Sequence, residues 1–212
     1  MRRRPAMLRC FLLLAVAGTL SACTLLPESD PATLHLLPAS ALERADGPPL
    51  EARLRVETPQ ASALLSGARI LVMPEPNRLQ AYAGARWSDR TPLLLRDRLV
   101  EGLRDRGRLS AHDDNSPLGA DVALVSDLRA FHSVYYQDVD QGVDPGLPVA
   151  VIRLDATLVE ETQRRLLGER RFEAREPSRG TDVQQVVEAF GRAADTLARE
   201  VAEWSEGVLE RR

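Results

Sequence analysis

The stretch of sequence that most resembles a cation site is residues 138–144. Asp138, Asp140 and Asp144 lie there, and carboxylates spaced in this way can converge on Ca²⁺, which takes six to eight oxygen ligands. The spacing departs from a calcium-binding loop, because its glycine comes one position early and Val149 stands where the bidentate glutamate is required. We therefore interpret the stretch as a solvated hairpin loop without a metal ion. Its three aspartates remain candidates for contact with a protein partner.

The sequence contains no motif typical of a catalytic centre. Its three histidines, His35, His112 and His132, have neither the spacing of metal ligands nor a serine or acidic partner at a recognised interval. There is no Gly-x-Ser-x-Gly turn and no glycine-rich phosphate-binding loop. We therefore predict a protein that is not an enzyme, binds no cofactor or metal, and uses its histidines structurally or exposes them to solvent.

Residues 20–23 (LSAC) indicate that the chain itself is covalently modified. They follow four arginines and an apolar run over residues 10–20, which is the layout of a secretory signal peptide. Because a cysteine takes the place of the usual small residue, the motif resembles the lipobox of bacterial lipoproteins, in which cleavage before the cysteine accompanies its acylation. We predict that residues 1–22 are a lipoprotein signal peptide and that Cys23 carries acyl chains. The alternative is an ordinary signal peptide with a chance cysteine.

The predicted mode of membrane attachment is an anchor and not a span. The apolar run has 11 residues, whereas about 20 are needed to cross a bilayer as a helix. Each buried methylene of an acyl chain contributes about 0.8 kcal/mol, so two or more chains bind durably. An aspartate after the lipobox cysteine favours retention in the inner membrane in enteric-type bacteria. By this resemblance, Thr24 indicates the periplasmic face of the outer membrane.

Removal of the signal peptide would change both the charge and the cysteine content. The chain has 28 basic and 31 acidic residues, and the predicted mature chain keeps 24 basic residues, all arginine, for a net charge of −7. An acidic domain has no electrostatic reason to bind nucleic acid. Cys10 would leave with the signal peptide and Cys23 would be acylated, so no thiol would remain for a disulfide, a nucleophile or a metal site.

The predicted mature chain divides into two regions. Residues 23–50 contain five prolines among polar residues, a composition typical of a semi-extended tether that is poorly suited to a packed core. Within this region, residues 33–37 are apolar enough for a short strand or a docking segment. Residues 51–212 have the size of one domain, which we expect to face the periplasm.

Alternating patterns predict a mixed, mostly antiparallel sheet. The clearest strand covers residues 150–158, where apolar side chains alternate with charged or polar ones. A polar turn at residues 161–164 should return the chain into an antiparallel partner over residues 166–174. Other strands are expected at residues 52–58, 68–73 (ended by Pro74 and Pro76), 78–82 and 121–136.

A first helix is predicted over residues 91–107. Thr91 is placed to cap it before Pro92, and Gly107 is a plausible end. Leucines four residues apart form its apolar stripe, and we expect Arg96 and Arg98 to lie away from the centre of that stripe.

A second helix is predicted over residues 182–206. Thr181 and Gln184 have the spacing of a capping box, and an apolar stripe that includes Val187 and Trp204 continues for about seven turns. A stripe of this length must lie across a sheet or against another protomer. The expected fold class is therefore α+β, with two main helices packed on the sheet.

Arg86 and Trp87 precede the first helix and allow two interpretations. A tryptophan in a chain that has only two could anchor a protein partner, together with the arginine beside it. More often such a residue closes the edge of a core with its indole N–H hydrogen-bonded. We favour the core interpretation for Trp87 and keep both residues as possible partner contacts.

Four features in sequence order resemble the ABC-type transport auxiliary lipoprotein family, which includes the paraquat-inducible protein C type. The first is Cys23 followed by a proline-rich segment with residues 34–36 (LHL). The second is residues 85–93 (ARWSDRTPL), which have one more residue before the proline than the family pattern. The others are the strand at residues 151–158 with its partner around residues 170–172 (RRF), and the last helix with its terminal tryptophan.

The resemblance implies a role without catalysis. Members accompany ABC transporters that carry lipids between the inner and outer membranes, with periplasmic substrate-binding subunits that contain the MCE domain. It implies an outer-membrane docking component, possibly a ring of identical subunits, and only Cys23 carries over as a functional residue. The alternative is a structural envelope lipoprotein that binds another cell-envelope assembly.

Overall fold

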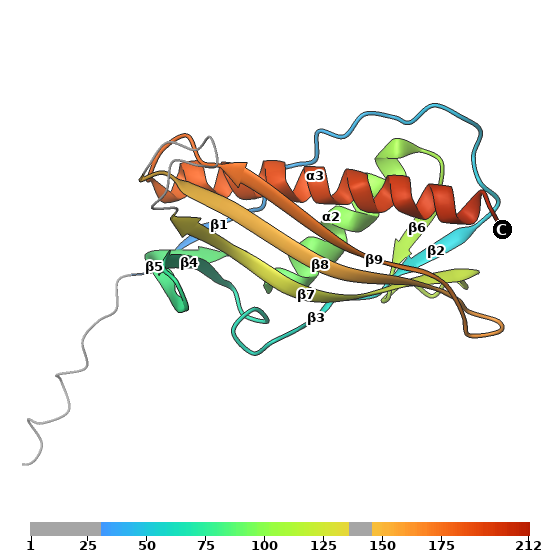
Figure 1. Ribbon diagram of the computed structural model, residues 1–212, viewed down its shortest axis with the longest axis horizontal. Coiled ribbons are helices and arrows are strands. Elements are labelled where there is room, and N and C mark those ends of the chain that lie inside the picture. The colour runs from blue at the N-terminus through green and yellow to red at the C-terminus, as the bar shows by residue number, and fades with distance from the viewer. Residues whose placement is uncertain (1–30, 136–145) are drawn as a thin grey trace, which may run out of the picture. The chain divides into compact units, whose positions relative to one another are not determined.

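The computed structural model describes residues 31–135 and 146–212, and from residue 32 onward they belong to one compact unit. In this unit two helices pack on one face of a mixed, mostly antiparallel sheet of nine strands (Figure 1), which confirms the predicted α+β class. The strands are β1 (Thr33–His35), β2 (Arg53–Val56), β3 (Gln60–Ala61), β4 (Arg69–Glu75), β5 (Arg78–Trp87), β6 (Ser110–Asp113), β7 (Val122–Tyr135), β8 (Pro148–Glu160) and β9 (Arg165–Pro177). The helices are α2 (Thr91–Arg106) and α3 (Val183–Leu209).

Strand β7 organises the sheet. One of its edges pairs in succession with β2, β3 and β4, which all run parallel to it, and the other edge pairs antiparallel with β8. β9 continues the antiparallel part beyond β8, β6 lies beyond β2, and β5 and then β1 lie beyond β4. β4 continues through Pro74 to Glu75, so it ends directly before Pro76, two residues later than the expected end at Met73.

The hydrophobic core lies between the sheet and the two helices. The inward side chains of β8 are at most 2% exposed: Ala150, Ile152, Leu154, Ala156 and Leu158. Burying an aliphatic side chain of this size contributes about 1.5–3 kcal/mol. The alternation along β8 therefore determines which face of the sheet the helices cover.

Helix α2 ends as expected and begins differently. Gly107 follows it with φ 75°, a left-handed conformation that glycine adopts without a steric cost, and its amide donates to the Arg104 carbonyl at 2.9 Å. The residue before the helix is Arg90, and the Thr91 hydroxyl donates to the Gly67 carbonyl at 2.7 Å. The predicted cap by Thr91 is therefore wrong, because its hydroxyl holds the loop before β4 instead.

Helix α3 has 27 residues and one buried stripe. Four large side chains of the stripe are at most 2% exposed: Val187, Phe190, Leu197 and Val201. The helix begins after Asp182 without a side-chain capping hydrogen bond, so the predicted capping box of Thr181 and Gln184 is wrong. In the described part of the chain, no helix combines the length and the apolar character that crossing a membrane requires.

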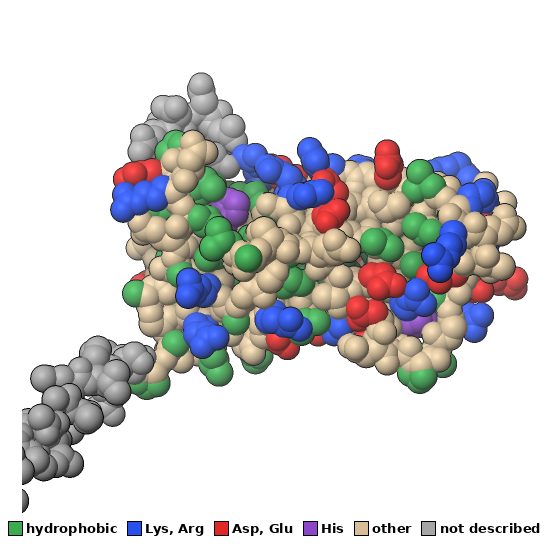
Figure 2. Space-filling model, turned by 90° about the horizontal axis from the view of Figure 1, so that it is seen from below, with side chains coloured by type: hydrophobic (Ala, Val, Ile, Leu, Met, Phe, Trp, Pro, Cys, Tyr) green, Lys and Arg blue, Asp and Glu red, His purple; other side chains and the backbone are tan. Residues whose placement is uncertain are grey.

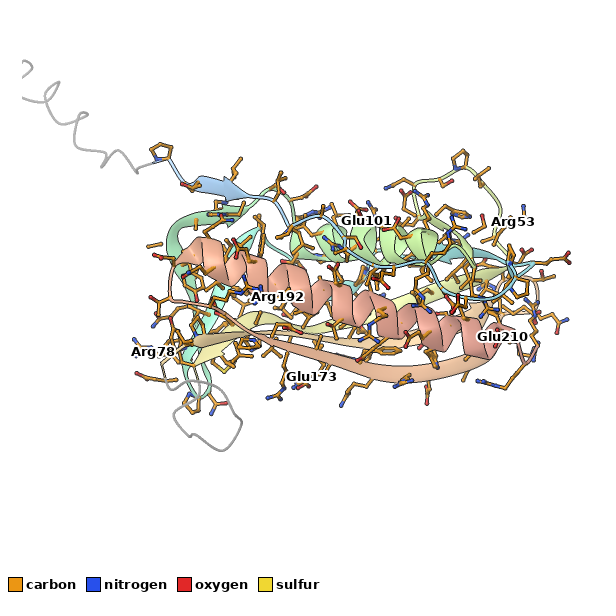
Figure 3. All side chains as sticks on the ribbon, turned by 90° about the horizontal axis from the view of Figure 1, so that it is seen from above. Arg53, Arg78, Glu101, Glu173, Arg192 and Glu210 are labelled. Atoms are coloured by element: carbon orange, nitrogen blue, oxygen red, sulfur yellow. The ribbon has the colours of Figure 1, made fainter. Side chains whose placement is uncertain are left out.

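Residues 36–50, here called the strap, lie against the helices instead of forming the expected tether (Figure 1). Seen from the helix side, the strap passes over α2, on which Glu101 is labelled (Figure 3). The Ala45 amide donates to the Arg106 carbonyl at 2.9 Å, and the Leu50 amide donates to the Arg108 carbonyl at 2.7 Å. The preceding strand β1, which falls in the expected short strand at residues 33–37, pairs parallel with β5.

Two helix glycines let the strap approach closely. A Cβ atom at Gly191 of α3 would lie 2.9 Å from the Pro38 ring, and one at Gly102 of α2 would lie 2.9 Å from the Leu42 side chain. Larger residues at either glycine would push the strap outward. The strap is thus fitted to the helix surface, and its prolines contribute contacts instead of preventing them.

Arg96 and Arg98 of α2 are buried, contrary to the expectation that they lie away from the apolar stripe. Their exposed fractions are 7% and 3%. Arg98 pairs with Asp195 of α3 and donates to the Pro38 carbonyl of the strap. Arg96 lies 2.9 Å from Asp114. A buried charge is costly unless it is paired and hydrogen-bonded. Both arginines are paired and hydrogen-bonded, although Arg98 Nε has no hydrogen-bond partner among the described residues.

Candidate contact surfaces

The predicted functional residues fall into two groups. Four of them lie outside the described residues: Cys23, Asp138, Asp140 and Asp144. The other two, Arg86 and Trp87, end strand β5, where successive side chains point to opposite faces of the sheet. Arg86 is exposed, whereas Trp87 is 1% exposed and belongs to the core. Trp87 therefore presents no surface to a partner.

Trp87 lies in a cluster of three aromatic rings. Its ring centroid is 5.8 Å from that of Phe131 and 5.4 Å from that of Phe190, both edge-on, and the two phenylalanines stack at 5.0 Å. The indole Nε1 is buried and has no hydrogen-bond partner among the described residues. The core interpretation of Trp87 is confirmed, but no residue in the described part of the chain accepts the expected hydrogen bond from its N–H.

The described residues contain no arrangement suited to a metal ion. Within residues 31–135 and 146–212, no group of three or more His, Cys, Asp and Glu side chains could hold one. His112 is 4% exposed, and its Nδ1 lies 3.2 Å from the Asp113 carbonyl oxygen. Burial, together with the charge of Arg153, lowers the pKa of His132 below its usual value. This imidazole is therefore neutral near pH 7.

The face of β7, β8 and β9 that points away from the helices carries many charged side chains. Arg129 and Arg171 both bind Asp155, at 2.9 and 2.5 Å, and Arg153 binds Glu173. We call the whole set the charge ladder; it consists of Asp127, Arg129, Arg153, Asp155, Arg171, Glu173 and Arg175.

Asp155 is the centre of the charge ladder. It lies directly opposite Asp127 on the neighbouring strand, a like-charge arrangement that is unfavourable without compensation. Hydrogen bonds from Arg171 and then from Arg129 lower the pKa of Asp155 to about 2. Exposed ion pairs contribute only about 0–1 kcal/mol each to stability. The ladder therefore gives this face a fixed charge pattern more than it stabilises the fold.

A hollow of about 640 Å³ lies where β4 and β5 separate. The strands pair at Arg69 with Arg86 and next at Leu71 with Ala81, so one residue of β4 stands opposite four residues of β5. A bulge of this kind bends the strand that carries the extra residues. Gly84, in the bulge, has φ 65° and open space where a Cβ atom would be. The bulge therefore creates the hollow.

The wall of the hollow is mostly small and apolar. Six residues make up most of it: Ala63, Leu64, Leu71, Ala81, Tyr82 and Ala85. Leu64 is 61% exposed. Burial raises the pKa of Tyr82 to about 12, although its hydrogen bond with Ser133 acts in the opposite direction, so the phenol stays neutral. The described residues that line the hollow include Arg69 and Arg86 but no aspartate or glutamate.

Sequence reasoning missed the hollow, although a signal for it exists. The strand predicted at residues 78–82 continues to Trp87, and it contains the run Ala83-Gly84-Ala85. A glycine inside a strand often marks a bulge or a close approach. The sequence could therefore have indicated an irregular strand, but not the loop at residues 63–68 that completes the wall.

Comparison with known proteins identifies relatives of the whole domain. The model of the family described as "ABC-type transport auxiliary lipoprotein component" matches residues 33–202. Among solved structures, protein XCC0632 from Xanthomonas campestris, of the DUF330 family, is 27% identical and has a TM-score of 0.75. The match covers 84% of this chain and 98% of that chain. No curated protein matches the sequence.

Two further solved structures share the fold at lower identity. An uncharacterised protein is 17% identical with a TM-score of 0.64, over 83% of this chain and 99% of that chain. The hypothetical protein CT253 from Chlamydia trachomatis is 8% identical with a TM-score of 0.50, over 76% and 98% of the two chains. At these identities the likeness concerns the fold alone.

Proposed function

The chain belongs to the family of ABC-type transport auxiliary lipoprotein components, and on that premise we propose that it serves an MCE-associated ABC system that carries lipids between membranes. Its role there is to dock the system and not to catalyse a reaction. The observation that carries the proposal is the extent of the family match, which covers residues 33–202 and therefore nearly all of the compact unit. The auxiliary domain thus accounts for nearly all of the compact unit of this chain.

The proposed place of action is the outer membrane, facing the periplasm. Residues 1–22 are the signal peptide and Cys23 carries the acyl chains, as the lipobox indicates. Because the compact unit starts at Ala32, nine residues link it to Cys23, and they can extend over about 30 Å at most. The link is shorter than the tether that composition predicted, so the domain works close to the membrane surface.

Replacing Cys23 by serine should abolish acylation, because serine offers no thiol for the thioether. The expected result is complete loss of radiolabelled palmitate from the protein and its release from the membrane fraction. The matched control is Cys10→Ser, which removes the other cysteine from the signal region and should leave labelling unchanged. Incorporation of palmitate into the Cys23→Ser protein would show that the anchor has been assigned to the wrong residue.

The proposed surface for the MCE-domain subunit, and for further copies of this chain in a ring, is the charge ladder. Helices and strap cover the opposite face of the sheet, while the ladder on β7, β8 and β9 presents a fixed pattern of both charge signs. Such patterns guide partner choice and association rate. The earlier assignment of Arg86 and the aspartates of residues 138–144 as partner contacts stays a prediction.

Co-purification with the MCE-domain subunit should depend on the ladder. Reversing Arg129 and Arg171 to glutamate is expected to lower the yield of the complex at least about tenfold, since like-charge contacts across an interface cost several kcal/mol. The control reverses Arg164 and Arg211, two exposed arginines outside the ladder. Equal capture by residues 23–50 alone would contradict the proposal. Capture of a different envelope assembly, without the MCE-domain subunit, would favour the structural alternative.

A further inference from the structure

Arg69 and Arg86 form an unusual pair at the rim of the hollow. They stand directly opposite each other on β4 and β5, where like charges repel. Most arginines in the described residues form an ion pair with a carboxylate, but neither Arg69 nor Arg86 does so within the described ranges. Asp127 and Asp155, which also face each other, are compensated by the positive charges of Arg129 and Arg171. The two guanidinium groups at the hollow have no such opposite charge beside them. An anion placed between them would provide it.

The hollow beside these arginines suits an apolar chain. Its volume of about 640 Å³ lies within the range of about 300–1,000 Å³ that is usual for ligand sites. Leu64 on its wall and Leu34 on the neighbouring strand β1 are 61% and 66% exposed. Figure 2 shows hydrophobic side chains beside arginines at the end of the domain that carries β4 and β5. This end thus combines unpaired positive charge with exposed apolar surface.

The hollow lies close in sequence to Cys23, which indicates what could reach it. Ala32, the first residue of the compact unit, is itself part of the lining. Cys23 is nine residues away, which allows at most about 30 Å of extended chain. If Cys23 is anchored, the hollow must therefore lie within that distance of the membrane surface.

We propose that the hollow between β4 and β5 binds one anionic phospholipid, with Arg69 and Arg86 at the phosphate and the apolar wall around part of an acyl chain. Arginine matches phosphate oxygens with paired N–H donors, and basic pockets near a membrane surface bind anionic headgroups. The inference rests on the proposed anchorage for the source of the lipid. It extends the proposed function from docking to direct contact with the molecules that the system carries.

The test is photolabelling of the purified full chain in neutral detergent micelles that contain a phosphatidylglycerol with a diazirine on its acyl chain. Because the protein is in micelles, labelling does not depend on the anchor, and acylation is read separately from the intact mass. Trypsin cuts after arginine, so most of the wall of the hollow falls in the peptides 56–69 and 79–86, and Leu71 falls in the peptide 70–78 between them. We expect the label in these three peptides, and several-fold less label from the matching phosphatidylcholine probe.

Variants of the arginines and of Leu64 distinguish a specific site from general adhesion. Arg69→Gln combined with Arg86→Gln should lower labelling about thirtyfold, since each of the two arginines contributes about 1 kcal/mol near an anionic lipid. The charge-matched control is Arg164→Gln with Arg211→Gln. Leu64→Asn should also lower labelling, and Leu118→Asn, at the same 61% exposure, should not.

Four outcomes would overturn the inference. The first two are photolabel found only in other peptides, and equal labelling by the phosphatidylglycerol and phosphatidylcholine probes. The third is unchanged labelling of the Arg69→Gln, Arg86→Gln double variant. The fourth is full competition by glycerol 3-phosphate, which would make a free phosphate ester the ligand. A correctly acylated protein that fails these tests would leave the proposed anchorage intact. An unacylated protein that passes them would refute the anchorage and keep the lipid site.

Discussion

Replacing Trp87 by alanine is expected to lower the free energy of unfolding by about 3–5 kcal/mol, the usual cost of truncating a buried aromatic residue. Trp87 is 1% exposed and contacts Phe131 and Phe190 edge-on. Edge-to-face pairs contribute about 0.5–1.5 kcal/mol beyond the area they bury. Because the indole Nε1 makes no hydrogen bond to a described residue, the loss comes from packing alone.

The matched control for this prediction is Trp204→Ala, which removes the other tryptophan. Trp204 is only half-buried and contacts one ring, that of Phe172, at 5.5 Å, so its truncation should cost clearly less than that of Trp87. Urea unfolding followed by circular dichroism measures both values without relying on tryptophan fluorescence. An equal or larger loss for Trp204→Ala would mean that the three-ring cluster is not the centre of the core.

The parts of the fold that were predictable are those whose signal is local. Along residues 150–158 the alternation of apolar and polar side chains is nearly unbroken, because one face packs on α3 and the other faces solvent. In α3, apolar residues recur every three or four positions, because one side of the helix is buried and the other is exposed. A strand or helix with one buried face has a periodic pattern of apolar residues in its own sequence, so it can be recognised without knowledge of distant residues.

The strap was missed because its signal is not local. Its five-proline neighbourhood is typical of a tether, and its packing depends on Gly102 and Gly191, which lie more than fifty residues further along the chain. Nothing in residues 36–50 indicates that two helix positions lack side chains to receive them. The buried position of Arg98 was missed for the same reason, since its partners come from the strap and from α3.

The candidate surfaces were predictable only in part. Arg86 and Trp87 were singled out together, but adjacent residues of a strand point to opposite faces, so only one of them can reach a partner. The hollow depends on a register shift between β4 and β5, and the charge ladder depends on the register of three strands. Both are products of pairing, which composition and spacing do not determine.

Replacing Asp195 by alanine is expected to lower the free energy of unfolding by about 3 kcal/mol. The change leaves the buried charge of Arg98 with only the more distant Glu101, 3.5 Å away and 46% exposed, as a carboxylate partner. Arg98 is 3% exposed, and Asp195 also accepts a hydrogen bond from the Ala41 amide of the strap at 3.3 Å. The same change should therefore loosen the strap and speed trypsin cleavage after the exposed Arg44.

A double-mutant cycle and a surface control separate this effect from a general loss of contacts. Arg98→Met combined with Asp195→Ala should cost less than the sum of the two single changes, since the double variant has no unpaired buried charge. Asp155→Ala in the charge ladder removes a more exposed carboxylate and should cost no more than about 1 kcal/mol. Chemical unfolding gives the energies of all four variants, and cleavage after Arg44 reports the strap separately. If Asp195→Ala were no more costly than Asp155→Ala, the strap would be held by its leucines and not by the buried ion pair.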